Sequence, residues 1–282
     1  MSTHDELNRR AEDGDVPAML ELAAASADLP DRVNWFLRAA QAGDATASDQ
    51  LIACRPELEA RAVGGDVECQ SVLGGVLLAR DEDPGRAASW FRRAAEAGHN
   101  EARRSLGYLL VEGAGVPKDV TGAERLFRAA ADEGDVLAQY NLAVLLLDEI
   151  PRPVDLNEVV PLLESAAQAG IEEAATRLGD ELDAVGDEAG ALRWYEVAAE
   201  GGHIGAMFAV GSRYRDGVGV QADSVQAVRW FLGMLDMPSF DGVHEILSMA
   251  PSLTDEQIRR GGRLAGRDDE AEKIIEMRAS SS

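Results

Sequence analysis

Four histidines and two cysteines are the residues of this sequence with the widest chemical range. Such side chains bind a metal where several of them, or a carboxylate, converge on one ion. His99 and His203 each stand directly after a glycine that ends a recurring phrase, three repeats apart, so one ion could not bridge them. A turn position that tolerates polar residues accounts for both, because other copies carry Asp or Ile there. We expect no metal site and no cofactor.

Cys54 and Cys69 are too few for the disulfide framework of a small secreted protein. The opening residues MSTHDELNRRAEDGD contain no apolar segment typical of a secretory signal. No stretch approaches the ~18 apolar residues of a membrane span. We therefore expect a cytoplasmic protein whose two reduced thiols act as small buried apolar side chains.

Catalytic motifs of defined spacing are absent from the sequence. It contains no Gly-x-Ser-x-Gly elbow, no P-loop and no His-Glu-x-x-His zinc motif. The glycine-rich stretch EGAGVPKD at 112–119 is not a phosphate loop, because no Gly-Lys-Ser or Gly-Lys-Thr follows it. We expect that the protein is not an enzyme, and only a pocket with convergent titratable groups would reopen that question.

The charge of the chain is strongly negative, with a formal net charge of −24 from 51 acidic and 27 basic residues. Binding to nucleic acid or to an anionic membrane needs clustered Lys and Arg, so neither partner is expected. Residues 148–200 hold 14 acidic and 3 basic residues. This segment is either a solvated face that favours solubility or a surface that steers a basic partner.

Helices must position any binding residues, because one phrase recurs along the chain at intervals typical of helical repeats. Its clearest copies are WFLRAAQAGD (35–44), WFRRAAEAGH (90–99), LFRAAADEGD (126–135), LLESAAQAGI (162–171) and WYEVAAEGGH (194–203). With two weaker copies, the glycines in register are Gly14, Gly43, Gly65, Gly98, Gly134, Gly170 and Gly202. Glycine suits the left-handed conformation that ends a helix.

A second phrase follows each glycine and predicts a second helix. A small residue stands four positions on, and a large-then-small pair such as Leu106-Gly107 stands eight and nine positions on. These spacings put the residues on one helical face, where small side chains let helices cross closely. Each interval, including the 22-residue interval 43–65, is thus interpreted as two amphipathic helices. Aromatic pairs such as Trp90-Phe91 are expected to wedge between successive hairpins.

These features together resemble the Sel-1-like repeat, a branch of the tetratricopeptide solenoids. The pattern runs from small-x3-Leu-Gly to a Gly-x-Gly-Val loop and then to an aromatic pair that leads into Ala-Ala-x-x-Gly. The loops EGAGVPKD (112–119) and DGVGVQAD (216–223) carry it most plainly, and the match is strongest over 66–235. The resemblance implies an all-α, right-handed superhelix of about seven helix-turn-helix repeats. It also implies an adaptor or scaffold whose concave surface holds proteins or peptides.

The repeat fails after residue 236, so we expect a solenoid over 1–236 and a helical cap with a short tail over 237–282. A short helix is expected within 240–249. Thr254 followed by Gln257 predicts a capped helix start within 252–278, and Gly261-Gly262 is a candidate break into two helices. Its apolar residues are Ile258, Leu264, Ile274 and Ile275. A terminal segment of this kind covers the last apolar face of a stack, and 279–282 is expected to fray.

A binding groove is implied by the resemblance, because the helix after each glycine lines the concave side of tetratricopeptide-like stacks. Its inward positions supply the candidates for partner binding: Arg104, Tyr108, Tyr140, Asn141, Arg177, Asp180, Phe208 and Ser212. Tyrosine and arginine are common anchors of protein interfaces. Asn141 and Arg177 are equivalent positions of adjacent repeats, where some related grooves hold a ligand carboxylate, but the full clamp pattern is absent. Ordinary packing between repeats is the alternative at each position.

The leading functional hypothesis is a non-enzymatic scaffold or adaptor that binds a protein or peptide on its concave face. The alternative is an acidic regulatory inhibitor, of the immunity or anti-toxin type, that masks a basic partner and binds less tightly as salt rises. Neither hypothesis involves nucleic acid or a membrane. The expected cap favours a monomer, because the ends of solenoids are surfaces that can pair.

Overall fold

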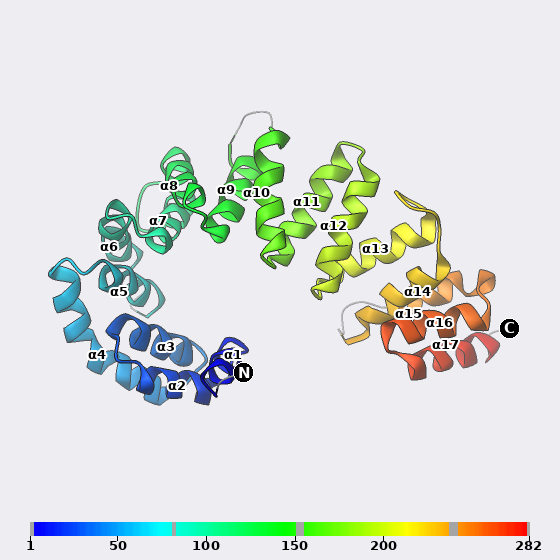
Figure 1. Cartoon of the computed structure of the whole chain (residues 1–282), viewed down its shortest axis with the longest axis horizontal. Coiled ribbons are helices and arrows are strands. Elements are labelled where there is room, and N and C mark those ends of the chain that lie inside the picture. The colour runs from blue at the N-terminus through cyan, green and yellow to red at the C-terminus, as the bar shows by residue number, and fades with distance from the viewer. Residues whose placement is uncertain (1–2, 81–82, 151–154, 237–241, 281–282) are drawn as a thin grey trace. The chain divides into compact units, whose positions relative to one another are not determined.

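The computed structural model describes residues 3–80, 83–150, 155–236 and 242–280. Within these residues every regular element is helical, and there are seventeen α-helices and two short 3-10 helices. The chain forms two compact units, Met1–Pro151 (unit 1) and Arg152–Ser282 (unit 2). In each unit, helices that follow one another in sequence pack side by side (Figure 1). The predicted all-α repeat architecture is confirmed.

The helices of the repeats are mostly of equal length. Unit 1 contains α1 (Thr3–Glu12), α2 (Val16–Ala25), α3 (Leu29–Gln41), α4 (Ala45–Val63), α5 (Val67–Ala79), α6 (Pro84–Glu96), α7 (Asn100–Glu112), α8 (Val120–Asp132) and α9 (Val136–Asp148). Unit 2 contains α10 (Leu156–Gln168), α11 (Glu172–Ala184), α12 (Glu188–Glu200), α13 (Ile204–Asp216), α14 (Ser224–Gly233), α15 (Gly242–Met249), α16 (Asp255–Ala265) and α17 (Asp268–Ser280). Two 3-10 turns, Met234–Asp236 and Ala250–Ser252, complete unit 2.

The seven glycines of the repeat register all follow the end of a helix, and their φ angles lie between 86° and 106°. Residues with a Cβ rarely adopt such positive φ angles. Glycine at these positions therefore ends one helix and turns the chain into the next without strain, as the sequence predicts.

The side chain after six of these seven glycines caps the helix that follows. Four of them are aspartates whose carboxylates accept the backbone N–H three residues on: Asp15, Asp44, Asp66 and Asp135. His99 Nδ1 accepts from Ala102 N at 3.2 Å, and His203 Nδ1 accepts from Ala206 N at 3.1 Å. Ile171 makes no side-chain cap. The two histidines thus satisfy donors that a helix start would otherwise leave unpaired, which is a more definite role than a tolerant turn position.

Small residues fill the crossings between helices. The residue four positions after each register glycine has no exposed surface: Ala18, Ala47, Cys69, Ala102, Ala138, Ala174 and Ala206. A Cβ added to Gly107 would lie 2.5 Å from the ring of Phe127, and one added to Gly179 would lie 2.7 Å from the ring of Tyr195. Glycine in the middle of a helix lowers stability by about 1 kcal/mol relative to alanine. Here it lets an aromatic ring of the next helix pack directly on the backbone.

One repeat solves the same packing problem with different residues. Ala143 in α9 stands where α5, α7, α11 and α13 carry glycine, and Leu163 in α10 stands where the helices after them carry the ring. Both side chains are fully buried. A smaller side chain thus accompanies the added Cβ, which is how volume is kept constant in a close-packed core.

The prediction that both rings of each aromatic pair wedge between hairpins is wrong. The second ring is buried, as at Phe91, which is 3% exposed. The first ring is only half-buried in three copies, Trp35, Trp90 and Trp194. Adjacent residues of a helix point about 100° apart, so one of two neighbours faces the core. Trp90 lies instead under its own helix's Arg93, whose guanidinium carbon is 4.7 Å from the ring centroid.

The prediction of two helices is also wrong for the interval 43–65. A single helix of 19 residues, α4, runs through it with Pro56 in its interior. Helices of the regular repeats, such as α7 and α8, have 13 residues each. Two such helices and their connection do not fit into 22 residues, so one long helix takes the place of a hairpin.

The Gly-x-Gly-Val loops join the two helices of one hairpin, α7 to α8 and α13 to α14. Gly113 ends α7 at a φ of 68°, and Gly115 follows at 69°. A Cβ on Gly115 would collide with the backbone of Gly85 at the start of α6. In the second loop, Gly219 packs in the same way against Glu188 at the start of α12. Each loop therefore packs on the hairpin before it, and glycine is required because the backbones touch.

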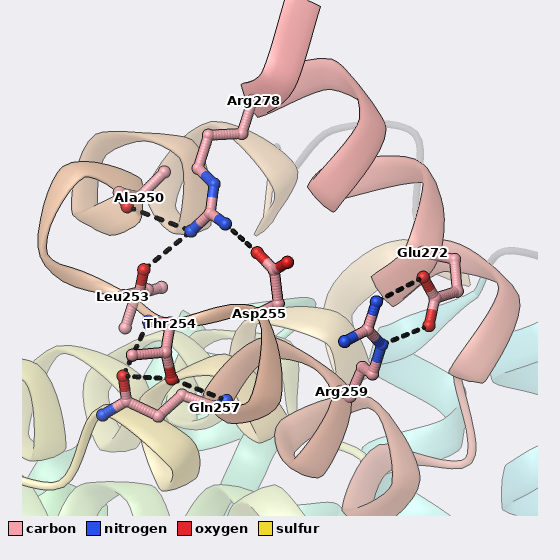
Figure 2. Close-up of polar contacts among 8 residues, drawn as sticks. All are labelled: Ala250, Leu253, Thr254, Asp255, Gln257, Arg259, Glu272 and Arg278. Atoms are coloured by element: carbon pink, nitrogen blue, oxygen red, sulfur yellow. Dashed lines mark hydrogen bonds and ion pairs between the residues drawn. The ribbon is translucent and has the colours of Figure 1, made fainter. Parts of the chain in front are cut away.

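Helices α15 and α16 pack on the last repeat helix, α14, and α17 packs on α16, around a shared core that contains Phe231, Ile246, Ile258 and Ile274. The predicted short helix is α15. The capping box is confirmed, because Gln257 N donates to Thr254 Oγ1 at 3.2 Å and Thr254 N donates to Gln257 Oε1 at 2.8 Å (Figure 2). Leu264, in contrast, is 48% exposed and does not belong to this core.

The predicted break at Gly261-Gly262 is wrong, because α16 continues through both glycines and ends at Gly266, whose φ is 68°. A Cβ on Gly262 would lie 2.6 Å from Ala271 Cβ in α17. The glycine pair therefore serves close helix packing. The expected fraying of 279–282 is wrong for the residues up to Ser280, which α17 includes. Positions 281–282, and 237–241 of the expected cap, lie outside the described residues.

Two arginines fix these last helices (Figure 2). Arg278 in α17 donates to the carbonyl oxygen of Leu253 at 2.7 Å and pairs with Asp255 at the start of α16. Arg259 Nε donates to Glu272 Oε1 at 2.7 Å, which joins α16 to α17. The end of unit 2 is thus held by polar contacts as well as by its core.

Candidate functional site

A hollow of about 260 Å³ lies between α7 and α9 in unit 1. Helix α7 contributes Tyr108, Val111 and Glu112 to its lining, and α8 contributes the buried Phe127. The remaining lining comes from α9 and the residue after it: Tyr140, Asn141, Val144, Leu145, Asp148 and Glu149. The body of the hollow is apolar and aromatic, and its polar groups stand mainly on acidic side chains.

The aromatic side chains of the hollow differ in exposure. Tyr108 is 58% exposed, which is unusual for a large ring on a repeat helix, whereas Phe127 is 3% exposed. Tyr140 is half-buried. The exposed ring of Tyr108 has no structural task that matches its size, and large amphipathic rings of this kind are common anchors in protein interfaces.

Acidic residues surround the open end of the hollow. Glu112 and Asp148 are the last residues of α7 and α9, and Glu149 follows directly. Lys118 Nζ donates to Glu149 Oε2 at 2.8 Å. Among the described residues that line the hollow, three are acidic and none is basic. The local potential is therefore negative even with Lys118 in place.

The structure brings three of the predicted groove residues together in this hollow, namely Tyr108, Tyr140 and Asn141. Arg104 lies outside its lining, since its Nε donates to Asp135 Oδ2 at 2.9 Å. That carboxylate also caps α9. Arg104 therefore supports the junction of α7 and α9.

The predicted residues of unit 2 do not form one site. Arg177 pairs with Glu181 on its own helix at 3.2 Å. Asp180 accepts a hydrogen bond from Tyr195 Oη at 2.6 Å. Phe208 is 38% exposed, and its ring centroid lies 6.1 Å from that of Phe231. Ser212 lines a second hollow.

The second hollow lies between α11 and α13, at the repeat position of the first. It is lined by Asp183, Glu188, Ala209, Ser212, Arg213, Asp216 and Val218. The guanidinium carbon of Arg213 lies 4.9 Å from the ring centroid of Tyr195, and its Nη2 is 2.8 Å from Asp183 Oδ2. Burial, followed by the hydrogen bond to Asp180, raises the pKa of the Tyr195 phenol well above its usual value. This hollow contains the protein's own cation.

Several lining residues were not found from the sequence. Phe127 follows Leu126 in its phrase, and no role was predicted for it. Glu112 and Asp148 are the last residues of equal-length helices, and they were read only as part of the general acidity. Arg213 stands eleven positions after Gly202, and Leu145 stands eleven positions after Gly134, so the two are equivalent in the repeat register. Following every register position through all repeats, and not only three of them, would have identified all four.

Other kinds of site find little support in the described part of the chain. It contains no group of three or more histidine, cysteine or acidic side chains placed to hold a metal ion. Among these residues no helix is both long enough and apolar enough to cross a membrane. Both cysteines are free thiols, with Cys69 buried and Cys54 half-buried.

The Sel1 repeat model matches residues 33–44, 73–99, 100–135, 136–171, 173–203 and 204–232. These segments cover more than half of the chain. The chain belongs to the Sel1 repeat family. Five of the six matched segments end one residue after a register glycine, and 45–72, where α4 replaces a hairpin, lies outside them.

Solved structures of Sel1 repeat proteins resemble this one. A protective antigen of uropathogenic Escherichia coli that displays this repeat fold is 25% identical, with a TM-score of 0.64, over 99% of this chain. This chain spans 66% of the length of that antigen. A Sel1 repeat protein from Oxalobacter formigenes is 19% identical with a TM-score of 0.61, over 82% of this chain and 94% of that one. No curated protein matches the sequence.

The family places the protein in a functional class. Sel1 repeat proteins are generally scaffolds for interactions between proteins, and they are typically non-catalytic. Their surfaces bind protein partners.

Proposed function

We propose that this Sel1 repeat protein is a non-enzymatic scaffold that binds a segment of a protein or peptide on the face formed by α7 and α9. The observation that carries the proposal is the hollow between these helices, with the exposed ring of Tyr108 at its edge. The position of the hollow agrees with the groove expected from the repeat register.

The size of the hollow supports a bound segment over a small-molecule ligand. Sites for drug-sized molecules usually enclose about 300–1,000 Å³, whereas this hollow has about 260 Å³. One large side chain of an extended segment fills a space of that size, and the rest of the segment would lie across the helices. Tyr108, Tyr140 and Asn141 are the contacts we assign to it.

The other candidate residues have weaker roles in the proposal. Arg104, Arg177 and Asp180 already have partners within the chain, so a ligand would compete with those contacts. Phe208 and Ser212 stay candidates for a separate contact in unit 2. Free thiols support the proposal that the protein acts in the cytoplasm, and a cap over α14 supports a monomer.

The acidic inhibitor is the less favoured alternative. Part of the charge of 148–200 is used within the fold, because Asp187 caps α12 and Asp183 pairs with Arg213. The remaining charge is compatible with a basic partner. Binding that falls steeply between ~50 and ~500 mM salt would favour this alternative, because exposed charge pairs are screened over that range.

The test of the scaffold proposal compares partner capture by the wild type and by Tyr108→Ala. Each protein is immobilised, exposed to a lysate of the source cell, and its bound proteins are identified by mass spectrometry. We expect Tyr108→Ala to lose a specific partner while circular dichroism stays unchanged, because the ring is exposed. Val197→Ala, which removes a 44% exposed side chain on α12, is the control. A partner retained at full level by Tyr108→Ala would contradict the proposal.

A further inference from the structure

We infer that the hollow between α7 and α9 receives an arginine side chain of the bound segment. The inference rests on the proposed function and names the chemistry of the partner. It follows from the acidic and aromatic lining of the hollow and from what the protein places in the equivalent hollow of unit 2.

Unit 2 contains an internal example of the proposed contact. Arg213 lies over the Tyr195 ring at 4.9 Å and pairs with Asp183 at 2.8 Å. Its side chain is only 12% exposed. A guanidinium therefore fits at this repeat position, between a ring from the second helix of a hairpin and an acid from the first.

Unit 1 has the same frame with no basic residue among the described residues that line it. Phe127 stands at the register position of Tyr195, and Leu145 at that of Arg213. Leu145 is 3% exposed and lines the hollow, so an apolar side chain takes the place that the cation has in unit 2. The acids stand at the ends of α7 and α9 instead, at Glu112 and Asp148.

Arginine matches this lining better than other side chains do. Its stem is apolar and packs on rings and aliphatic side chains, while its planar head pairs with carboxylates and stacks on aromatic faces. An acidic side chain would meet three lining carboxylates, counting Glu149. An apolar side chain would leave the acids at the rim without a gain in contact. Lysine provides the charge but lacks the planar head.

Variants at Lys118 test the inference through the direction in which the affinity for a peptide changes. Its ammonium pairs with Glu149 at 2.8 Å and is 53% exposed, so it competes with an incoming cation for the same carboxylates. Lys118→Ala should therefore strengthen binding of an arginine segment, whereas Glu112→Gln should weaken it. Both signs would reverse for an acidic segment.

The experiment selects a random peptide library on the full-length protein and sorts the enriched peptides by their loss of binding to Tyr108→Ala. One enriched peptide is then synthesised with arginine and with citrulline, which keeps the shape but lacks the charge. We expect the citrulline form to bind at least about tenfold more weakly, which is the size of a desolvated charge contact. Glu112→Gln should weaken the arginine peptide several-fold, Lys118→Ala should strengthen it, and Glu101→Gln, on the same helix outside the hollow, should leave it unchanged.

The outcomes separate this inference from the proposed function. Peptides that need Tyr108 but bind equally well with citrulline would overturn the arginine inference and leave the scaffold proposal standing. A selection in which no enriched peptide depends on Tyr108 would count against both.

Discussion

The hollows of the two units show which parts of a repeat stay constant and which parts vary. Both lie between the first helices of neighbouring hairpins, and both stand next to an aromatic residue of the second helix. In unit 1 this position is Phe127 and the described lining contains no basic residue, whereas in unit 2 it is Tyr195 and Arg213 lies over its ring. Core positions keep their packing, and the positions one turn away determine which charges line the hollow.

The constant part is the contact between glycine and ring. Gly107 faces Phe127 and Gly179 faces Tyr195 at almost the same separation. The variable part is polar: Tyr108 in unit 1 is replaced in register by Asp180 in unit 2, and Asp180 binds the phenol of Tyr195. The same frame therefore yields an exposed aromatic site in one unit and a closed polar network in the other.

The largest expected effect tests whether the ring that packs on the helix glycine, Phe127 in unit 1 and Tyr195 in unit 2, has the same structural role in both units. Phe127→Ala should lower the free energy of unfolding by about 3–5 kcal/mol, since it leaves a cavity beside Gly107. Tyr195→Ala should cost a similar amount. Urea unfolding followed by far-ultraviolet circular dichroism measures both. A cost below about 1 kcal/mol for either variant would show that its ring is not a core element.

A smaller effect is expected when a methyl group is added to the constant contact. Gly107→Ala should destabilise by about 1–3 kcal/mol, because its Cβ would overlap the Phe127 ring. Phe127→Leu in the same chain should restore part of the loss, since the pair would then copy Ala143 and Leu163. A double-mutant cycle measures the coupling. Strict additivity of the two changes would contradict this account of the repeat.

The arrangement of the helices could be predicted because its determinants are local. The register glycines need positive φ angles, and residues such as Ala102 must be small wherever two helices cross, so both leave a periodic signal in the sequence. The error in the interval 43–65 was avoidable, since 22 residues cannot contain two full helices and a turn. The error at Gly261-Gly262 was not, because a glycine that packs against another helix and a glycine that ends one look alike until the partner helix is known.

The candidate site was predicted only in part, for a related reason. Tyr108, Tyr140 and Asn141 follow from the register, which fixes the face of a helix. Which groups share that face depends on neighbours from other helices, and Arg213 shows that one side chain can place the protein's own cation there. Pairings such as Arg104 with Asp135 are tertiary contacts, and no spacing within one helix indicates them.

The cation that lines the second hollow should contribute less to stability than the ring below it. Arg213→Leu removes a cation–π contact and a partly exposed ion pair, and we expect a cost of about 1 kcal/mol. Arg86→Leu, which changes a 60% exposed side chain with a pair at 4.0 Å, is the control and should have almost no effect. Equal costs for the two variants would mean that Arg213 is not held by the contacts on which the comparison of the hollows depends.

The smallest effect at neutral pH is expected for Tyr195→Phe, which removes the hydrogen bond to Asp180 and should cost about 0.5–1 kcal/mol. The effect of this substitution on the pH dependence of the free energy of unfolding is more informative. The fold raises the pKa of the Tyr195 phenol, first by burial and then through Asp180, and burial together with Glu196 raises the pKa of Tyr214 to about 12.

A phenol whose pKa is raised by folding contributes stability that is fully present below its unfolded pKa of about 10 and is lost as the pH rises through the folded value. The free energy of unfolding of the wild type should therefore fall as the pH rises above about 10. Tyr195→Phe should make that fall shallower, and Tyr214→Phe should remove a separate share. The other groups that ionise in this range, among them Cys69, whose pKa burial raises to about 11, are the same in the wild type and the variants, so their contribution cancels in the comparison. If Tyr195→Phe left the slope unchanged, the phenol would not be held by burial and Asp180 as the structure requires, and the contrast with the hollow of unit 1 would rest on Arg213 alone.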